Sequence, residues 1–240
     1  MEINTFSIVA RCERTGHLGI AVSSAVPSVG SICMYIEPGI GAVSTQSWVN
    51  PYLAIEALAH IKERSDARLA LDKAIANDPD SGLRQIGLVG TAGFGAAFTG
   101  SDCTSWKGHL VGADYAIQGN MLTGAQTLEA MQKIWLTNSS MDLAERLMQV
   151  LEAGDQAGGD LRGKQSAALK VMGREIYAEV DLRVDEHNEP VAELRRVLEV
   201  AKKQLLPFVQ GMPKRHGTST ALPDSVKQML LRPPASRNAG

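Results

Sequence analysis

Thr5 has the clearest chemical potential in the chain, because it opens the β-branched-rich run 5–11 close to the N-terminus. If residues 1–4 were removed, Thr5 would carry both a hydroxyl group and a free α-amine. An α-amine has an ordinary pKa near ~8 and can accept the hydroxyl proton, so the two groups make a nucleophile and its base without a histidine. The alternative is that Thr5 and Ser7 are alternating residues of an ordinary edge strand.

Polar side chains also gather where other expected strands end. Gln46 ends one such strand and Asn50 follows it, and Gln118 and Asn120 lie in the same way at the end of a later one. Amide groups placed in this way can donate hydrogen bonds to the oxyanion that develops during amide hydrolysis. Each has a structural alternative, since Asn50 can cap the helix that follows it and Asn120 can form a turn.

Arginine and tryptophan side chains suit substrate binding or assembly. Arg84 and Arg162 could each hold a substrate carboxylate through the planar guanidinium fork. Trp48 could form either a pocket wall or part of an interface between subunits. Together with Trp106 and Trp135 it is also a candidate anchor of a homodimer or larger homo-oligomer, because buried aromatic residues dominate interfaces.

Composition and spacing exclude several other functions. Lys plus Arg number 24 against 26 Asp plus Glu, and the resulting charge of -2 lacks the positive field of a nucleic-acid-binding protein. No apolar run approaches the roughly 20 residues of a membrane span, and the basic start of a secretory signal is missing. Three cysteines without a CxxC pair and five histidines without HxH or HxxxH spacing favour neither disulfides nor a metal site. The glycine-rich segments 90–95 and 158–163 lack the Lys-Ser/Thr of a phosphate loop. We therefore expect a cytoplasmic protein without metal, cofactor, nucleic-acid partner or membrane partner.

The order of apolar patterns predicts strands and helices in separate blocks, starting with a hairpin that turns at Thr15-Gly16. This order indicates an α+β fold in which two antiparallel sheets pack face to face with helix pairs outside. The expected strands are 5–11, 18–24, 39–46, 84–89, 95–99, 115–118, 165–172 and 176–184, and the expected helices are about 51–61, 66–77, 124–136, 142–152 and 190–205.

The C-terminal segment differs in kind from the rest of the chain. Residues 211–240 hold four prolines and five Lys/Arg against one Asp, a charge of about +4. Apart from an apolar stretch at 226–231, no hydrophobic period is present there. We expect residues 1–210 to form one domain and residues 211–240 to be a flexible or loosely docked tail.

The first two strands resemble those of N-terminal-nucleophile hydrolases. In that superfamily Thr-x-x-apolar-apolar-Ala begins one strand and Gly-apolar-apolar-apolar-Ala/Ser follows on the next. The rest of the chain resembles more closely a bacterial and archaeal family of unknown function placed in the same superfamily. The motifs that carry these resemblances are Thr5-Phe-Ser-Ile-Val-Ala-Arg11, Gly19-Ile-Ala-Val-Ser23, Gly41-Ala-Val-Ser-Thr-Gln-Ser-Trp-Val-Asn-Pro51, Leu83-Arg-Gln-Ile-Gly87, Ala97-Phe-Thr-Gly100, Tyr115-Ala-Ile-Gln-Gly-Asn120, Ala157-Gly-Gly-Asp-Leu-Arg-Gly-Lys-Gln-Ser-Ala-Ala168, Asp181-Leu-Arg-Val-Asp185 and Pro190-Val-Ala-Glu-Leu-Arg195.

The resemblance implies a four-layer αββα sandwich like that of the proteasome β-subunit, and hydrolysis of amide bonds. Thr5 matches the nucleophile, and Asp160 resembles the aspartate that hydrogen-bonds the nucleophile region. The chain departs from the pattern at two positions. The aspartate usual after the second strand would fall at Ala25, and the lysine usual beside the nucleophile would fall near Met34 or Tyr35.

Two functions follow as hypotheses. The first is an amidohydrolase that cleaves a small amide, acyl-amino acid or short peptide through an acyl-enzyme on Thr5, after a protease or self-cleavage has removed residues 1–4. The second is a catalytically silent binding or scaffold protein on the same fold, since a fold does not determine function. For the first, the site residues are expected to line one pocket with Thr5 at its floor. The expected catalytic residues are Thr5, Asp160, Gln46 and Asn50, and the expected substrate-binding residues are Trp48, Gln118, Asn120, Arg162 and Arg84.

Overall fold

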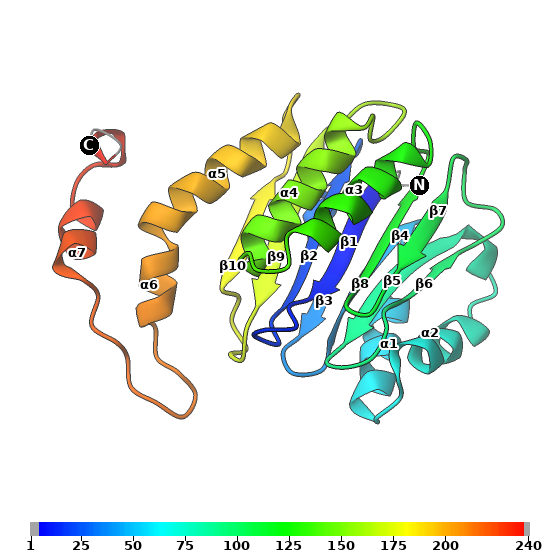
Figure 1. Cartoon of the computed structure of the whole chain (residues 1–240), viewed down its shortest axis with the longest axis horizontal. Helices are drawn as coiled ribbons and strands as arrows, with labels where there is room; N and C mark the ends of the chain where they lie inside the picture. Colours follow the sequence, from blue (N-terminus) through cyan, green and yellow to red (C-terminus); the bar gives the residue numbers. More distant parts are fainter. Residues whose placement is uncertain (1–4, 238–240) are drawn as a thin grey trace. The chain divides into compact units, whose positions relative to one another are not determined.

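The computed structural model describes residues 5–237, and the chain forms two compact units, Met1–Leu194 and Arg195–Gly240. The segment 1–4, whose removal would expose Thr5, lies outside the described residues. Both β-sheets belong to the first unit, together with the helices α1 to α4 (Figure 1).

The first unit contains a six-stranded sheet and a four-stranded sheet, and all the strand pairs in them are antiparallel. The larger sheet has the order β10-β9-β2-β1-β8-β7, so that β1 lies near its centre between β2 and β8. The smaller sheet has the order β3-β4-β5-β6. The strands are β1 Thr5–Arg11, β2 Leu18–Ser24, β3 Met34–Glu37, β4 Gly41–Ser47, β5 Arg84–Gly90, β6 Ala96–Thr99, β7 Gly108–Val111, β8 Tyr115–Asn120, β9 Ser166–Met172 and β10 Val180–Val184.

Helix pairs pack on the outer face of each sheet. Helices α1 (Pro51–Lys62) and α2 (Ala67–Ala76) contact strands of the four-stranded sheet. Helices α3 (Gln126–Thr137) and α4 (Leu143–Gln156) contact strands of the six-stranded sheet, over which they are drawn in green in Figure 1. The two sheets face each other through contacts of β1, β2 and β8 with β4 and β5. The expected α+β class with two antiparallel sheets is confirmed.

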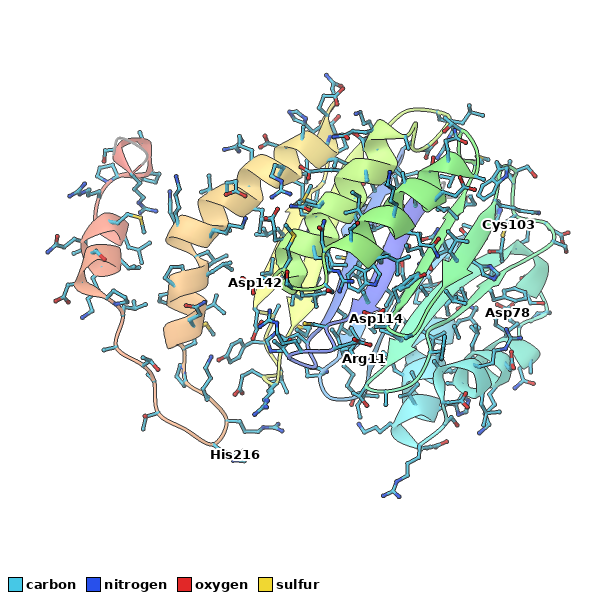
Figure 2. The ribbon with its side chains drawn as sticks, in the orientation of Figure 1. Arg11, Asp78, Cys103, Asp114, Asp142 and His216 are labelled. Carbon is cyan, nitrogen blue, oxygen red and sulfur yellow. The ribbon has the colours of Figure 1, made fainter. Side chains whose placement is uncertain are left out.

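Alternation along β1 determines what lies on each side of it. Phe6 faces the helix layer, where its ring lies against the positions of Gly154 and Gly159. Val9 faces the other sheet and belongs to an apolar cluster between the sheets. Arg11 ends the strand, and its guanidinium donates to the carbonyls of Gly90 (2.7 Å), Gly93 (3.1 Å) and Ala113 (3.0 Å); Figure 2 labels it beside Asp114. The inter-sheet space is therefore apolar in its middle and closed by an arginine at this end.

Local sequence explains where the elements begin and turn. The β1–β2 hairpin turns at Gly16, whose φ of 73° suits glycine. Asn50 caps α1 by accepting a hydrogen bond from the Tyr52 N–H, with Pro51 as first helical residue. Asp66 caps α2 in the same way. Both helix starts lie where the sequence predicts them.

The structure differs from the sequence expectations at three strands and at one tryptophan. The strands β3 and β7 are only four residues long, and sequence periodicity did not predict them. Strand β10 begins at Val180 and not at Ile176, because the preceding residues form bends. Trp135, expected as an interface anchor, is fully buried under the Arg146 guanidinium, which lies 3.4 Å from its ring centroid.

Helix α5 (Pro190–Gln204) crosses the boundary between the two units, and its expected apolar face is buried at Val191 and Leu194. The second unit also contains α6 (Leu206–Gly211), α7 (Asp224–Leu230) and a 3₁₀ turn at Pro234–Ser236. None of the residues in 211–237 is buried. Across the described part of the chain, no helix is long and apolar enough to cross a membrane.

Candidate functional site

Thr5 is the first residue of β1 and lies between Ser24 of β2 and Asn120 of β8 in the strand register. Its side chain is fully buried. The Thr5 hydroxyl donates to Ser24 Oγ at 3.2 Å. The end of the inter-sheet space opposite Arg11 is therefore built around a threonine hydroxyl.

Gln46 of β4 connects Thr5 to the facing sheet. Its Nε2 donates to the Thr5 carbonyl oxygen (3.1 Å), while its Oε1 accepts from the Ser7 hydroxyl (2.6 Å). Ser7 in turn accepts from Gln118 Nε2 at 2.6 Å and from Ser44 Oγ at 3.2 Å. We call these residues, with Ser24, Gln85 and Asn120, the inter-sheet polar cluster.

Gln85 of β5 is the hub of the inter-sheet polar cluster, although the sequence did not single it out. Its Oε1 accepts from Gln46 Nε2 (2.7 Å) and from Asn120 Nδ2 (2.9 Å). Its Nε2 donates to the Gly119 carbonyl (2.8 Å) and to Thr99 Oγ1 (2.9 Å). The one available signal was an amide side chain directly before the apolar run 86–90 of the same strand. Such a residue must find partners when it is buried.

Gly87, two residues further along β5, makes room for the Gln118 amide. A Cβ atom at this position would overlap the Oε1 of Gln118. The missing side chain thus lets an amide from β8 lie against the backbone of β5. This close approach is the physical reason for a glycine inside a central strand.

Three buried polar atoms have no hydrogen-bond partner within the described residues: Ser47 Oγ, Gln118 Oε1 and Asn120 Oδ1. Two of them belong to the ends of β4 and β8. The backbone is strained at the same places, since Ser47 has a φ of 65° and Met121 has a φ of 50°. Unpaired buried polar groups and positive φ values at non-glycine residues are both typical of functional sites.

Asp160 lies beside the Thr5 end of the inter-sheet polar cluster. Its carboxylate accepts from the backbone N–H of Ala25 (3.2 Å), the residue after Ser24, and from the N–H of Arg162 (2.9 Å). The Arg162 side chain also lies 3.5 Å from Asp160, which is 1% exposed while Arg162 is 41% exposed. Asp160 thus holds the end of β2, which carries the hydroxyl partner of Thr5.

Asn50 and Arg84 lie in a separate group around Asp78, which is labelled in Figure 2. Arg84 Nε donates to Asp78 (2.8 Å), and Asn50 Nδ2 donates to the same carboxylate (3.1 Å). The hydrogen bond from Arg84 is the main reason why the pKa of Asp78 is lowered. Arg84 also donates to the carbonyl of Trp48, whose side chain is 36% exposed. The structure thus uses Asn50 and Arg84 to hold the start of α1 and does not bring them into the inter-sheet polar cluster.

The side chains of the inter-sheet polar cluster are uncharged. An ionisable group joins its network through Thr99, whose hydroxyl lies 2.9 Å from His109 Nδ1. Partial burial lowers the pKa of His109, and the charge of Arg68 lowers it further.

Cys33 is fully buried, and burial raises the pKa of its thiol to about 12, so it is not a thiolate nucleophile at neutral pH. Among the described residues, no group of three or more His, Cys, Asp or Glu side chains could hold a metal.

Fold and site together define a class: an α+β protein whose two facing antiparallel sheets enclose a neutral polar cluster at the start of a central strand. The chain belongs to the family of unknown function DUF1028, whose pattern matches residues 5–194.

One solved structure shows the same fold, and two others match it more weakly. The crystal structure of protein SPO2555 from Silicibacter pomeroyi, assigned to DUF1028, is 26% identical with a TM-score of 0.82, and the match covers 90% of this chain and 100% of that one. Anbu (ancestral beta-subunit) from Yersinia bercovieri matches at 12% identity and a TM-score of 0.40, over 87% of this chain and 98% of that one. Anbu from Hyphomicrobium sp. strain MC1 matches at 10% identity and a TM-score of 0.40, over 88% of this chain and 99% of that one. A comparison with functionally curated proteins gives no match.

Proposed function

We propose that this protein is an N-terminal-nucleophile amidohydrolase that cleaves a small amide, acyl-amino acid or short peptide through an acyl-enzyme on Thr5. The proposal includes the four-layer αββα sandwich that the resemblance implies, with α1 and α2 on one outer face and α3 and α4 on the other. The observation that carries it is the place of Thr5. Its hydroxyl lies in the inter-sheet polar cluster at the first residue of β1, 3.2 Å from Ser24 Oγ.

The reaction needs a chain that begins at Thr5. Thr5 Oγ forms a bond to the substrate carbonyl carbon while its proton passes to the α-amine. The C–N bond then breaks as the resulting ammonium gives that proton to the departing nitrogen, which leaves an ester on Thr5. Water attacks the ester, the α-amine accepts a proton from the water, and the acid product leaves with the Thr5 hydroxyl restored.

The proposal gives Asp160 and Arg162 separate roles. Asp160 is almost fully buried beyond the end of β2, so its negative charge acts at short range and stabilises the ammonium form of the amine during the reaction. Arg162 is half-exposed and can bind a carboxylate of the substrate at the rim of the site.

The test compares two forms of the protein, the full chain and a chain cut before Thr5 by a site-specific protease. Both are incubated with a β-lactone, whose ring opens to form an ester on a nucleophilic hydroxyl. We expect the mass of the cut chain to increase by that of the probe. The full chain should stay unmodified, because its Thr5 nitrogen is an amide and cannot serve as a base.

Variants then assign the nucleophile. Thr5→Ala in the cut chain should abolish acylation, and Thr5→Ser should keep part of it because the hydroxyl remains. Thr15→Ala, a change in the hairpin turn, should leave acylation unchanged. Equal acylation of the unaltered cut chain and the Thr5→Ala chain would show that the nucleophile is elsewhere.

One observation favours the second hypothesis, a catalytically silent binding protein. The members of the inter-sheet polar cluster are fully buried and bond to one another, as a purely structural network would. In that case the cut chain stays unmodified by the lactone. Thr5→Ala then changes only the stability of the fold.

A further inference from the structure

Asn120 presents a buried amide oxygen, Oδ1, that has no partner among residues 5–237. Asn120 pairs directly with Thr5 in the register of β8 and β1. Side chains opposed in this way have Cβ atoms about 4.5–5.5 Å apart, so the Asn120 amide is within hydrogen-bond reach of groups on Thr5. A buried acceptor without a partner is costly, and the position therefore favours an N–H donor beside it.

Gln85 determines which end of the Asn120 amide faces Thr5. Asn120 Nδ2 donates to Gln85 Oε1 at 2.9 Å, and the same oxygen accepts from Gln46 Nε2. The Gln85 amide cannot turn over, because its Nε2 is bonded to the Gly119 carbonyl and to Thr99 Oγ1. With its nitrogen held by Gln85, Asn120 has to direct its oxygen away from Gln85.

We propose that Asn120 Oδ1 accepts a hydrogen bond from the α-amino group of a chain that begins at Thr5, and that Gln85 is the positioning residue that turns the Asn120 amide this way. The inference rests on the proposed function, since only a chain cut before Thr5 has an α-amine there. One N–H directed at Asn120 restricts where the nitrogen lone pair can point. The amine is thereby oriented to take the proton from Thr5 Oγ1.

The test measures the pKa of the α-amine itself and so does not depend on hydrolysis. The cut chain retains all the described elements, which begin at Thr5. It is labelled with ¹³C-threonine, and the Thr5 Cα signal is identified by its loss in Thr5→Ser. The pH dependence of that signal gives the pKa of the amine.

Two substitutions at Asn120 should shift this pKa in opposite directions. Asn120→Leu keeps the shape but removes the acceptor, so the pKa should fall by about 0.5 to 1 unit. Asn120→Asp places a carboxylate beside the ammonium, so the pKa should rise by about 1 unit or more. The matched controls Asn138→Leu and Asn138→Asp, at the end of α3, should leave it unchanged. The same α-amine pKa in both Asn120 variants would overturn the inference.

The positioning role of Gln85 is tested by whether the α-amine pKa shifts caused by changes at Gln85 and Asn120 add up. Gln85→Met should lower the pKa as Asn120→Leu does, and the double variant should lower it no further, because both changes remove the same bond. Additive shifts would overturn the positioning role. If Gln85→Met does not fold, hydrogen exchange in the unaltered full chain decides: a slowly exchanging Asn120 side-chain N–H supports the bond to Gln85, and fast exchange of both N–H groups overturns it. A cut chain that shows the opposite shifts but resists the β-lactone refutes the hydrolase and leaves the Asn120 contact standing.

Discussion

At the scale of single residues, uncharged amides and hydroxyls fill the inter-sheet space next to Thr5 where apolar side chains would otherwise pack. A buried polar group without a partner costs about 1–3 kcal/mol, and the inter-sheet polar cluster limits this cost because its members bond to one another. Turning one amide, such as that of Gln85, would leave several others unpaired. The Thr5 hydroxyl and carbonyl are therefore held in one geometry.

The fit between Gly87 and Gln118 gives a prediction about stability. In Gly87→Ala the new Cβ displaces the Gln118 amide and breaks its bond to Ser7. We expect a loss of about 1–3 kcal/mol in the free energy of unfolding, measured by urea denaturation. Gly90→Ala is the control on the same strand, since its Cβ would meet nothing closer than 3.6 Å. Equal effects of the two changes would contradict the role of Gly87.

His109 gives a prediction about pH. Partial burial of its ring and the charge of Arg68 lower its pKa in the fold, so the folded protein favours the neutral imidazole. The contribution of His109 to the free energy of unfolding is therefore fully present above its unfolded pKa of about 6.5. It is lost as the pH falls from there through the pKa of His109 in the folded protein. An NMR titration should place the His109 pKa below 6.5, and Arg68→Gln should raise it. A His109 pKa above 6.5 in the unaltered protein would show that the stated causes do not dominate.

At the scale of elements, the sequence predicted those parts that turn residues, prolines and local composition determine. Runs rich in β-branched residues on either side of the Thr15-Gly16 turn predicted β1 and β2, while Pro51 predicted the start of α1 and Pro79 the end of α2. Strands β3 and β7 are four residues long, too short for the sequence analysis to detect, and they form by pairing with β4 and β8. Among the residues of the inter-sheet polar cluster, too, the sequence indicated some and missed others. Polar strand ends indicated Gln46, Gln118 and Asn120 as candidate site residues. Gln85 could be recognised only from the structure, in which β5 pairs with β4 and contacts β8.

The start of α1 depends on the group around Asp78, which gives a prediction for this element. Arg84 and Asp78 are 13% and 4% exposed, so Arg84→Met leaves a carboxylate buried without its main partner. We expect this change to cost about 3–5 kcal/mol in the free energy of unfolding. Arg68→Met removes the exposed ion pair with Asp72 and should cost less than about 1 kcal/mol. Similar costs for the two variants, measured by denaturant unfolding, would show that the Asp78 group does not stabilise this helix start.

At the scale of the whole molecule, the residues matched by the family and the first compact unit end at the same place, residue 194. That unit contains both sheets, the inter-sheet polar cluster and Asp160. The elements needed for the proposed chemistry therefore lie within residues 5–194.

The burial pattern predicts the effect of shortening the chain. No residue in 211–237 is buried, so a chain ending at residue 210 should unfold within about 2 °C of the full chain in a calorimeter. A chain ending at residue 189 loses the buried Val191 and Leu194, and its unfolding temperature should fall by several degrees or more. Equal losses in both chains would mean that the terminal segment stabilises the fold.

The central claim is that Thr5 supplies both the nucleophile and the base, and covalent trapping of both groups tests it most directly. An epoxyketone can bond to a threonine hydroxyl through its ketone and to the α-amine of the same residue through its epoxide. Peptide mass spectrometry of the treated cut chain should find one probe added, with both bonds on Thr5. An adduct on Ser7 or Cys33, or a chain that stays unmodified while folded, would contradict the claim.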